Sequence, residues 1–458
     1  MNNCSLARSQ PSAAVATGTR GKSRRWLALL CWLVPVAALA TPYKALESFD
    51  LVWDTVREAH FDYPSIEAAW EQARQDYRSK VAEAESQTEV RRLIQRMLDE
   101  LETSHFVILG ASTLPEALEG SGASGGSGRS TGIEVRIVDE QAVTWRLAED
   151  SAALEAGLAT GWVIEAFDGR KIQPLLADAL AMDEGQQRTW ALTFLQSMLS
   201  ERLGHPGGSG EIELVVRNDR DQQITLTLAA RQTNRQRFSL GALPALGFDF
   251  HSQRLAAGED CIGYLRFSTW VPALGAEMAA AMPGLRDCMG MIIDLRGNPG
   301  GIAGMMMNVA AYFYDEPATL GTMITSAGEL NFRALPRRVE LDGTPVEPFT
   351  GPLAIIVDEL SASTSEMFAA GIQVTGRGRV FGQPTPGMAL PAGMLRLPNG
   401  DRLMYALADY VDPDGDRIEG AGITPDFLEP RRLDDLRTGI DRPLVSARDW
   451  ILENISSP

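Results

Sequence analysis

The most informative hydrophobic pattern in the chain is a continuous apolar run that ends in small hydroxyl residues and gives way to a helical pattern. The run, residues 352–357, has the length and composition of a strand buried on both faces. Apolar residues then recur at helical spacing over residues 367–372. The segment between them, residues 360–366, therefore lies at a helix N-terminus, where free backbone N–H groups stabilise negative charge. Ser363, in its middle, is either a helix cap or a nucleophile.

A second apolar run ends in a glycine-rich turn. Residues 291–295 read as a buried strand, residues 298–301 are Asn-Pro-Gly-Gly, and a helical pattern begins at Ile302. Glycines leave backbone N–H groups open to a ligand. The turn lacks the Gly-Lys-Ser/Thr ending of a phosphate-binding loop, so an oxyanion hole is the better interpretation.

Two cysteines precede predicted strands. Cys261 comes before the apolar run 262–267, Cys288 comes before 289–295, and a helical pattern separates the two runs. If the strands are parallel neighbours in a βαβ unit, their N-terminal ends lie together and a disulfide is feasible in an oxidising compartment. The alternative is a pair of buried, unbonded thiols.

The first forty residues have the pattern of a secretory signal peptide. Four basic residues at positions 20–25 precede the apolar run 26–39, which ends in small residues. An uncleaved membrane anchor is the alternative, but after cleavage no permanent membrane span is expected. Residues 1–40 contain five basic and no acidic residues, so their removal changes the formal net charge from −18 to −23. That surface argues against nucleic acid and anionic membranes as partners.

The middle of the chain resembles a PDZ domain. Residues 150–169 contain a short helix ending in Ala-Gly-Leu, a Gly-Trp turn, a strand and an Asp-Gly hairpin turn. PDZ domains bind a peptide tail as an added strand and hold its carboxylate with backbone N–H groups. The resemblance places that carboxylate-binding loop at Thr131, Gly132 and Ile133, with a helical insertion expected over residues 175–203.

Four motifs in chain order resemble those of the C-terminal processing peptidases, tail-specific proteases related to the tricorn protease core. The motifs are Ser-His at 104–105, Asp-Leu-Arg-Gly-Asn-Pro-Gly-Gly at 294–301, Ser-Ala-Ser-Thr-Ser-Glu at 361–366 and Glu-Gly-Ala-Gly-Ile-Thr-Pro-Asp at 419–426. The resemblance implies that Ser363 is the nucleophile. It also implies a multidomain α+β fold with a helical N-terminal domain, a PDZ-like β module with a helical insertion, and an α/β catalytic core of the crotonase/ClpP type.

This chain lacks the lysine that serves as general base in the Ser–Lys members of that family. Those members carry a lysine downstream of the nucleophile, where this chain has Met388, and no lysine follows Lys171. The tricorn-like branch uses serine, histidine and glutamate, with a second serine directly before the histidine. Its pattern matches Ser104, His105 and Glu419 in addition to the nucleophile.

These residues imply a consistent mechanism. His105 would deprotonate Ser363 and later protonate the leaving amine, while Glu419 orients the histidine, directly or through Ser104. Backbone N–H groups of three residues are candidates for binding the oxyanion: Gly300, Gly301 and Thr364. A histidine base predicts activity that declines below about pH 6–6.5.

The sequence therefore predicts an exported serine endopeptidase, periplasmic or extracellular, that hydrolyses protein or peptide substrates, recognises C-terminal tails and needs no cofactor or metal. The alternative is an inactive relative that acts through its PDZ module or binds apolar ligands. The expected boundaries are 1–40 for the signal peptide, 41–112 for the helical domain, 113–130 for a Gly/Ser-rich loop, 131–233 for the PDZ-like domain, 234–430 for the catalytic domain and 431–458 for a C-terminal segment.

Overall fold

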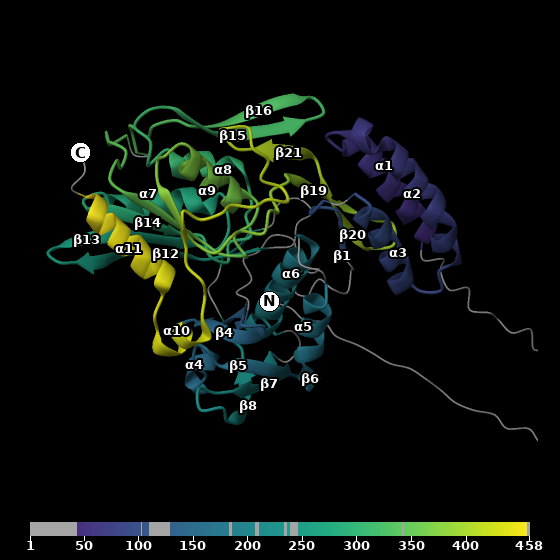
Figure 1. Ribbon diagram of the computed structural model, residues 1–458, viewed down its shortest axis with the longest axis horizontal. Coiled ribbons are helices and arrows are strands. Elements are labelled where there is room, and N and C mark those ends of the chain that lie inside the picture. The colour runs from purple at the N-terminus through teal and green to yellow at the C-terminus, as the bar shows by residue number, and fades with distance from the viewer. Residues whose placement is uncertain are drawn as a thin grey trace, which may run out of the picture. The chain divides into compact units, whose positions relative to one another are not determined.

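The structure is a computed structural model that describes residues 44–101, 103–109, 129–182, 186–206, 210–232, 236–238, 246–340 and 343–455. The predicted signal peptide and nearly all of the predicted Gly/Ser-rich loop lie outside the described residues. The described chain is a multi-sheet α+β protein that begins with helices, as the sequence predicts (Figure 1). Among its helices, none has the length and apolar character needed to cross a bilayer.

Three helices open the described chain and share a core with a small sheet. The helices are α1 (Ala45–Ala59), α2 (Tyr63–Glu83) and α3 (Gln87–Asp99). The sheet has the order β1-β20-β19, made by Val107–Leu109, Arg402–Ala406 and Ala392–Arg396. Leu390, Leu397 and Leu403 are buried among the apolar helix faces. The core of the helical region predicted for residues 41–112 therefore includes strands from the predicted catalytic domain. The helical periodicity of residues 41–112 does not indicate this contribution.

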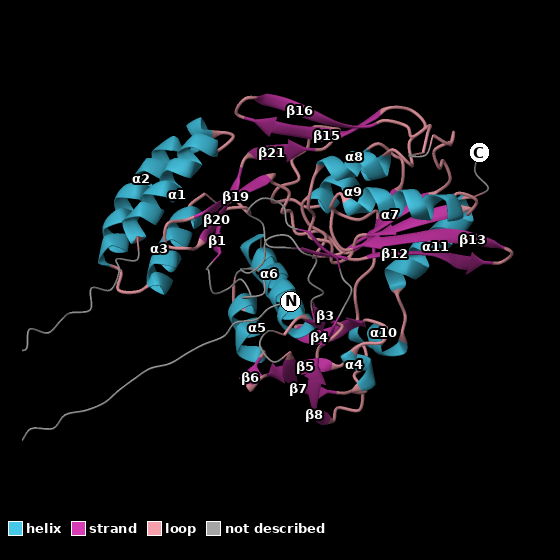
Figure 2. Cartoon of the chain, turned by 180° about the vertical axis from the view of Figure 1, so that it is seen from behind, coloured by secondary structure: helices cyan, strands magenta, loops and turns pink. Residues whose placement is uncertain are grey.

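The second sheet has the strand order β3-β4-β5-β7-β8, with β6 on β5. Its strands are β3 (Ile133–Val138), β4 (Gln141–Leu147), β5 (Val163–Phe167), β6 (Arg170–Lys171), β7 (Glu211–Arg217) and β8 (Gln223–Ala229). Its helices are α4 (Ala152–Glu155), α5 (Gln173–Leu180) and α6 (Gln186–Gly204). Helices α5 and α6 occur where the helical insertion is predicted, and α6 lies along the edge strand β3 (Figure 2).

The third sheet is the one that positions the candidate nucleophile. Its order is β12-β13-β14-β17-β18-β22, with every neighbouring pair parallel except β12 and β13. The strands are β12 (Phe250–Ala257), β13 (Asp260–Phe267), β14 (Gly290–Asp294), β17 (Leu353–Val357), β18 (Arg379–Gly382) and β22 (Phe427–Leu428). Strands β14 and β17 are fully buried, as their continuous apolar runs predict.

Helices cover both faces of this sheet, because alternate residues of each strand point to opposite sides. Helices α7 (Ala273–Ala281), α8 (Gly304–Ala310) and α9 (Thr364–Val374) pack in one core with Leu265, Ile293 and Ile355. Helix α11 (Arg442–Asn454) packs in another core with Ile292 and Ile356. The turns that follow β14 and β17 consequently meet at the carboxyl edge of a sheet fixed from both sides.

The remaining elements are short. They are a sheet of order β16-β15-β21 (Gly328–Ala334, Ala318–Thr325, Ala408–Val411), the pairs β2–β9 (Arg129–Ser130, Arg231–Gln232) and β10–β11 (Gln236–Phe238, Leu246–Phe248), helix α10 (Leu433–Thr438) and a 3-10 turn at Met282–Gly284.

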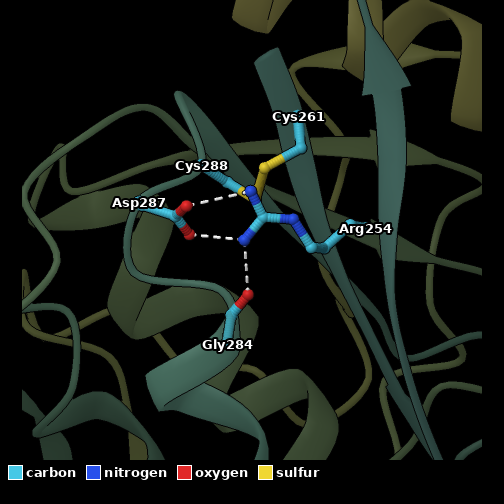
Figure 3. Close-up of a disulfide and its surroundings, with 5 residues drawn as sticks. All are labelled: Arg254, Cys261, Gly284, Asp287 and Cys288. Atoms are coloured by element: carbon cyan, nitrogen blue, oxygen red, sulfur yellow. Dashed lines mark hydrogen bonds and ion pairs between the residues drawn. A yellow bond between two sulfur atoms is a disulfide. The ribbon is translucent and has the colours of Figure 1, made fainter.

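Cys261 and Cys288 form a disulfide between the starts of the parallel strands β13 and β14. Figure 3 shows Arg254 beside it, donating hydrogen bonds to Asp287 and to the carbonyl of Gly284. The two cysteines are 27 residues apart, so the bond restricts a moderately long loop in the unfolded chain.

Replacing both cysteines by serine is expected to lower the free energy of unfolding by about 3 kcal/mol, mainly through the added entropy of the unfolded chain. Urea unfolding of wild type and the double variant, each with and without a reducing agent, measures this difference. The reducing agent should destabilise only the wild type, and equal stability of the two oxidised proteins would contradict the prediction.

Candidate active site

Ser363 occupies a sharp turn between β17 and α9. Its backbone has φ 55° and ψ −120°, which a residue with a side chain rarely adopts. The Ser363 N–H donates to the carbonyl of Met388 at 2.9 Å and to Glu366 Oε2 at 3.0 Å. These two bonds hold the strained conformation. Strained turns of this kind, between a strand and a helix, present nucleophilic serines in other hydrolases.

The glycine-rich turn after β14 lies directly against the nucleophile. A Cβ built on Gly300 would be 2.7 Å from the Ser363 Cβ and 3.0 Å from the Thr364 nitrogen. Gly300 also has φ 99°, so its backbone conformation favours glycine as well. Any larger residue here would displace Ser363.

The three predicted oxyanion donors differ in their availability. The Gly300 N–H donates to Asn298 Oδ1 at 3.0 Å and is therefore used within the turn. Within the described part of the chain, the N–H groups of Gly301 and Thr364 donate to no acceptor. Of the three predicted donors, Gly301 and Thr364 therefore keep an N–H group without an acceptor among the described residues, and Gly300 provides space for Ser363.

Ser104, His105 and Glu419 form a second hydrogen-bonded set. Ser104 Oγ lies 2.5 Å from His105 Nδ1, and the Ser104 N–H donates to Glu419 Oε1 at 2.8 Å. The other carboxylate oxygen of Glu419 accepts from the Ala389 N–H at 2.9 Å. All three side chains are buried. Ser104 therefore connects Glu419 to His105. The sequence leaves open whether Glu419 contacts the histidine directly or through Ser104.

The segment around Met388 joins this set to the nucleophile. The Met388 carbonyl accepts from the Ser363 N–H, and the next residue, Ala389, donates to Glu419. Among the residues that the structure describes, no hydrogen bond links the Ser363 hydroxyl to His105. Bonds between nucleophile and base commonly form only when substrate is bound. The structure thus links Ser363 to Glu419, Ser104 and His105 through the hydrogen bonds of two consecutive residues, Met388 and Ala389.

Burial controls ionisation in this site. It lowers the pKa of His105 to about 4, so the imidazole is neutral and able to accept a proton well below pH 6. Burial also raises the pKa of Glu419, against the opposing effect of hydrogen bonds from Ser104 and Ala389. The pKa of His105 revises the predicted decline in activity below pH 6–6.5, because the base remains unprotonated to lower pH.

Glu366 is a residue of this site that the sequence analysis did not single out. Its buried carboxylate accepts hydrogen bonds from Thr385, Gly387 and Met388 as well as from Ser363. Burial raises its pKa to about 7, although these hydrogen bonds act in the opposite direction. The signal was present, because a glutamate three residues after a serine at a helix start is typical of a capping box.

The backbone groups of the predicted carboxylate-binding loop already have hydrogen-bond or strand partners within the chain. The Thr131 N–H donates to the Gly204 carbonyl at 2.8 Å, the Gly132 N–H donates to Ser130 Oγ at 3.0 Å, and Ile133 pairs with Leu147 on β4. In this conformation Thr131 and Gly132 cannot also hold a peptide carboxylate.

Helix α6 also occupies the open edge of β3. Ser200 Oγ accepts from the Val135 N–H at 2.9 Å, and Gln196 Oε1 accepts from the Ile137 N–H at 2.6 Å. A peptide that added to β3 as a strand would need these donors. The edge is therefore closed to strand addition while α6 is in place.

The site contains a serine in a strained turn, a histidine bonded to a serine that also contacts a carboxylate, and two N–H groups without an acceptor among the described residues. Serine-type hydrolases use groups of these kinds. Residues 261–428 match the family model of peptidase family S41. This match to a family of serine-type peptidases confirms the resemblance noted in the sequence.

Characterised proteins show the same similarity. The chain is 24% identical over 422 residues to a chloroplastic C-terminal processing peptidase from Tetradesmus obliquus, covering 89% of this chain and 83% of the relative. It is 25% identical over 288 residues to the chloroplastic carboxyl-terminal-processing peptidase 2 of Arabidopsis thaliana, 62% of this chain and about half, 49%, of that relative. The structure of a photosystem II D1 C-terminal processing protease matches with a TM-score of 0.54 and 22% identity, covering 84% of this chain and 93% of that one. This structural match supports the multi-sheet α+β fold.

The low pKa of His105 predicts a loss of stability in acid. In the unfolded chain its pKa is about 6.5, so between pH 6.5 and 4 the unfolded state binds a proton that the folded state excludes. The free energy of unfolding should fall as the pH falls through this window, by roughly 3 kcal/mol from this residue. Urea unfolding at several pH values measures the slope.

The His105→Gln variant should lose this part of the pH dependence, because glutamine does not titrate. His251→Gln is the matched control, since His251 is exposed on β12. If wild type and His105→Gln had the same slope between pH 6.5 and 4, the shift in the pKa of His105 would be refuted.

Proposed function

We propose that this chain is a serine endopeptidase that hydrolyses protein or peptide substrates, with Ser363 as nucleophile and His105 as base. The observation that carries the proposal is the connected set of hydrogen bonds from Ser363 through the segment at Met388 to Glu419, Ser104 and His105. The match to the model of peptidase family S41 supplies the reaction class.

In the proposed acylation step, His105 Nε2 accepts the hydroxyl proton of Ser363 while Oγ bonds to the scissile carbonyl carbon. The neutral imidazole then carries its own proton on Nδ1 and donates it to Ser104 Oγ, which leaves Nε2 free to accept. The oxyanion receives hydrogen bonds from the Gly301 and Thr364 N–H groups.

The C–N bond then breaks, and the proton on Nε2 passes to the leaving amine. Water repeats the sequence on the acyl-enzyme, releasing a carboxylic acid and restoring the Ser363 hydroxyl. While the imidazolium exists, the Glu419 carboxylate stabilises its charge through Ser104.

The proposal includes export and the finer domain assignment. The basic and apolar pattern of residues 1–40 supports a signal peptide, and the Cys261–Cys288 disulfide fits a periplasmic or extracellular setting. We assign residues 131–233 to a PDZ-like module and residues 234–430 to a catalytic core of the crotonase/ClpP type. The strand and helix order over these ranges supports the assignment.

Recognition of C-terminal tails is a further part of the proposal. The names of the relatives support it, since they are C-terminal processing peptidases. In the PDZ-like module, a tail could reach Thr131, Gly132 and Ile133 only after α6 has moved off β3 and released the N–H groups that it binds. Tail binding at this edge is therefore expected to be weak unless α6 is displaced.

A fluorophosphonate probe tests the nucleophile. Wild type should be labelled covalently and should cleave fluorescein-labelled casein, whereas Ser363→Ala and His105→Gln should show at least ~10³-fold slower labelling or cleavage. Ser252→Ala, an exposed serine on β12, is the matched control and should behave as wild type. A folded wild type that neither reacts nor cleaves would favour the alternative of an inactive binding protein.

A second experiment tests whether α6 blocks tail binding. In a Ser363→Ala background, the Gln196→Ala/Ser200→Ala variant should bind a short fluorescein-labelled peptide with a free C-terminal carboxylate ~10-fold more tightly, because two edge N–H groups lose their internal acceptors. Fluorescence anisotropy measures the affinity. Thr227→Ala on β8 is the control. Unchanged affinity, or equal binding of the amidated peptide, would argue against this site.

A further inference from the structure

We propose that Thr269 is a positioning residue that aims the N–H group of Gly301 into the oxyanion site, an inference that rests on the proposed peptidase function. Thr269 lies in the loop between β13 and α7 and is 2% exposed. Its Oγ1 donates to the Gly300 carbonyl at 2.8 Å, and the N–H of the next residue, Trp270, donates to the same oxygen at 3.0 Å.

The geometry of the peptide bond connects this contact to the oxyanion donor. The Gly300 carbonyl and the Gly301 N–H belong to one planar trans peptide unit, in which they point in opposite directions. Two donors that fix the direction of the carbonyl oxygen therefore fix the direction of the N–H group. That N–H group makes no hydrogen bond within the described part of the chain, so its own partner cannot orient it.

The turn needs such restraint because its last two residues are glycines. Gly300 and Gly301 have φ values of 99° and 146°, and glycine can leave such conformations at little steric cost. Hydrogen bonds to the Gly300 carbonyl restrain the backbone conformation of the turn in place of the side chains that glycine lacks. A Cβ on Gly301 would lie 2.4 Å from the Trp270 carbonyl oxygen, so this side of the turn is closely packed.

The same loop is bound to the nucleophile helix. The Trp270 indole N–H donates to Ser365 Oγ at 2.9 Å, and Thr364 Oγ1 donates to the Gly301 carbonyl at 3.0 Å. Hydrogen bonds thus connect the backbone segments of both proposed oxyanion donors, Gly301 and Thr364, to the loop that contains Thr269 and Trp270. The Thr269 hydroxyl differs from the other contacts in that it can be removed while Trp270 still donates to the Gly300 carbonyl.

The Thr269→Val variant, which is nearly isosteric, tests the inference. With an internally quenched peptide that the wild type cleaves, kcat should fall ~10-fold and KM should change less than ~2-fold, because the donor acts mainly on the developing oxyanion. A peptide aldehyde should inhibit the variant ~10-fold more weakly. In that adduct Ser363 Oγ bonds to the aldehyde carbon, the hydroxyl proton moves to His105, and the alkoxide occupies the oxyanion site.

Two further variants separate positioning from general damage. Thr269→Ser restores the hydroxyl and should recover most of the lost kcat, whereas Thr269→Ala, which adds no methyl group against the carbonyl, should show the same loss as valine. Thr322→Val, which removes an exposed hydroxyl on β15, should leave both constants unchanged.

The outcomes distinguish the two proposals. A wild type without hydrolysis or probe labelling would refute the peptidase function itself. An active wild type with valine and alanine variants that keep their kcat and aldehyde affinity would refute only the role of Thr269. A serine variant as impaired as the valine variant would also refute it, because the hydroxyl would then not be the group that matters.

Discussion

The buried carboxylate of Asp358 is the interaction on which the geometry of the site depends. Its Oδ1 accepts the Gly297 N–H at 2.9 Å and the Leu360 N–H at 3.0 Å, so one atom ties the oxyanion turn to the nucleophile turn. Burial alone would raise the pKa of Asp358, but the guanidinium groups of Arg136 and Arg431 hold it below its usual range. A buried charge is tolerated only with such partners. The separation of the two turns is therefore set by this buried ion cluster.

Because Arg136 belongs to β3, the second sheet is part of this cluster. The Arg136 Nε donates to Asp358 at 3.0 Å, and both side chains are almost fully buried. Helix α6 adds two contacts of its own, from Thr193 and Trp190 to carbonyl groups in the segments beside Ser363 and Met388. Displacing β3 or α6 would break these contacts with the segments that carry Ser363 and Met388. Events at the β3 edge are consequently coupled to the catalytic turns by direct contacts.

The sequence predicts those features that depend on a short run of consecutive residues. It does not predict those that depend on contacts between distant parts of the chain. The apolar runs of β14 and β17, the turn at Ser363 and the Ser104-His105 pair are all visible in consecutive residues. The occupation of the Gly300 N–H by Asn298, and of the β3 edge by α6, depends on which side chain meets which backbone group after packing. The pattern of apolar and polar positions in the sequence gives no information about such contacts. The same holds for residues 390–406, whose place in the helical core follows from strand pairing over some 300 residues of chain.

The proposed base, His105, explains why that long-range pairing is needed. A lysine at the position of Met388 would lie on the segment that already binds the Ser363 N–H, so it would be placed by local structure. His105 instead precedes β1, which pairs with β20 and is held to α3 by Gln95 through the Phe106 carbonyl and the Ile108 N–H. The histidine reaches the site only if the helical region is docked on β20. If His105 is the base, as proposed, the N-terminal region is a structural requirement for catalysis, because its loss would remove the proton acceptor itself.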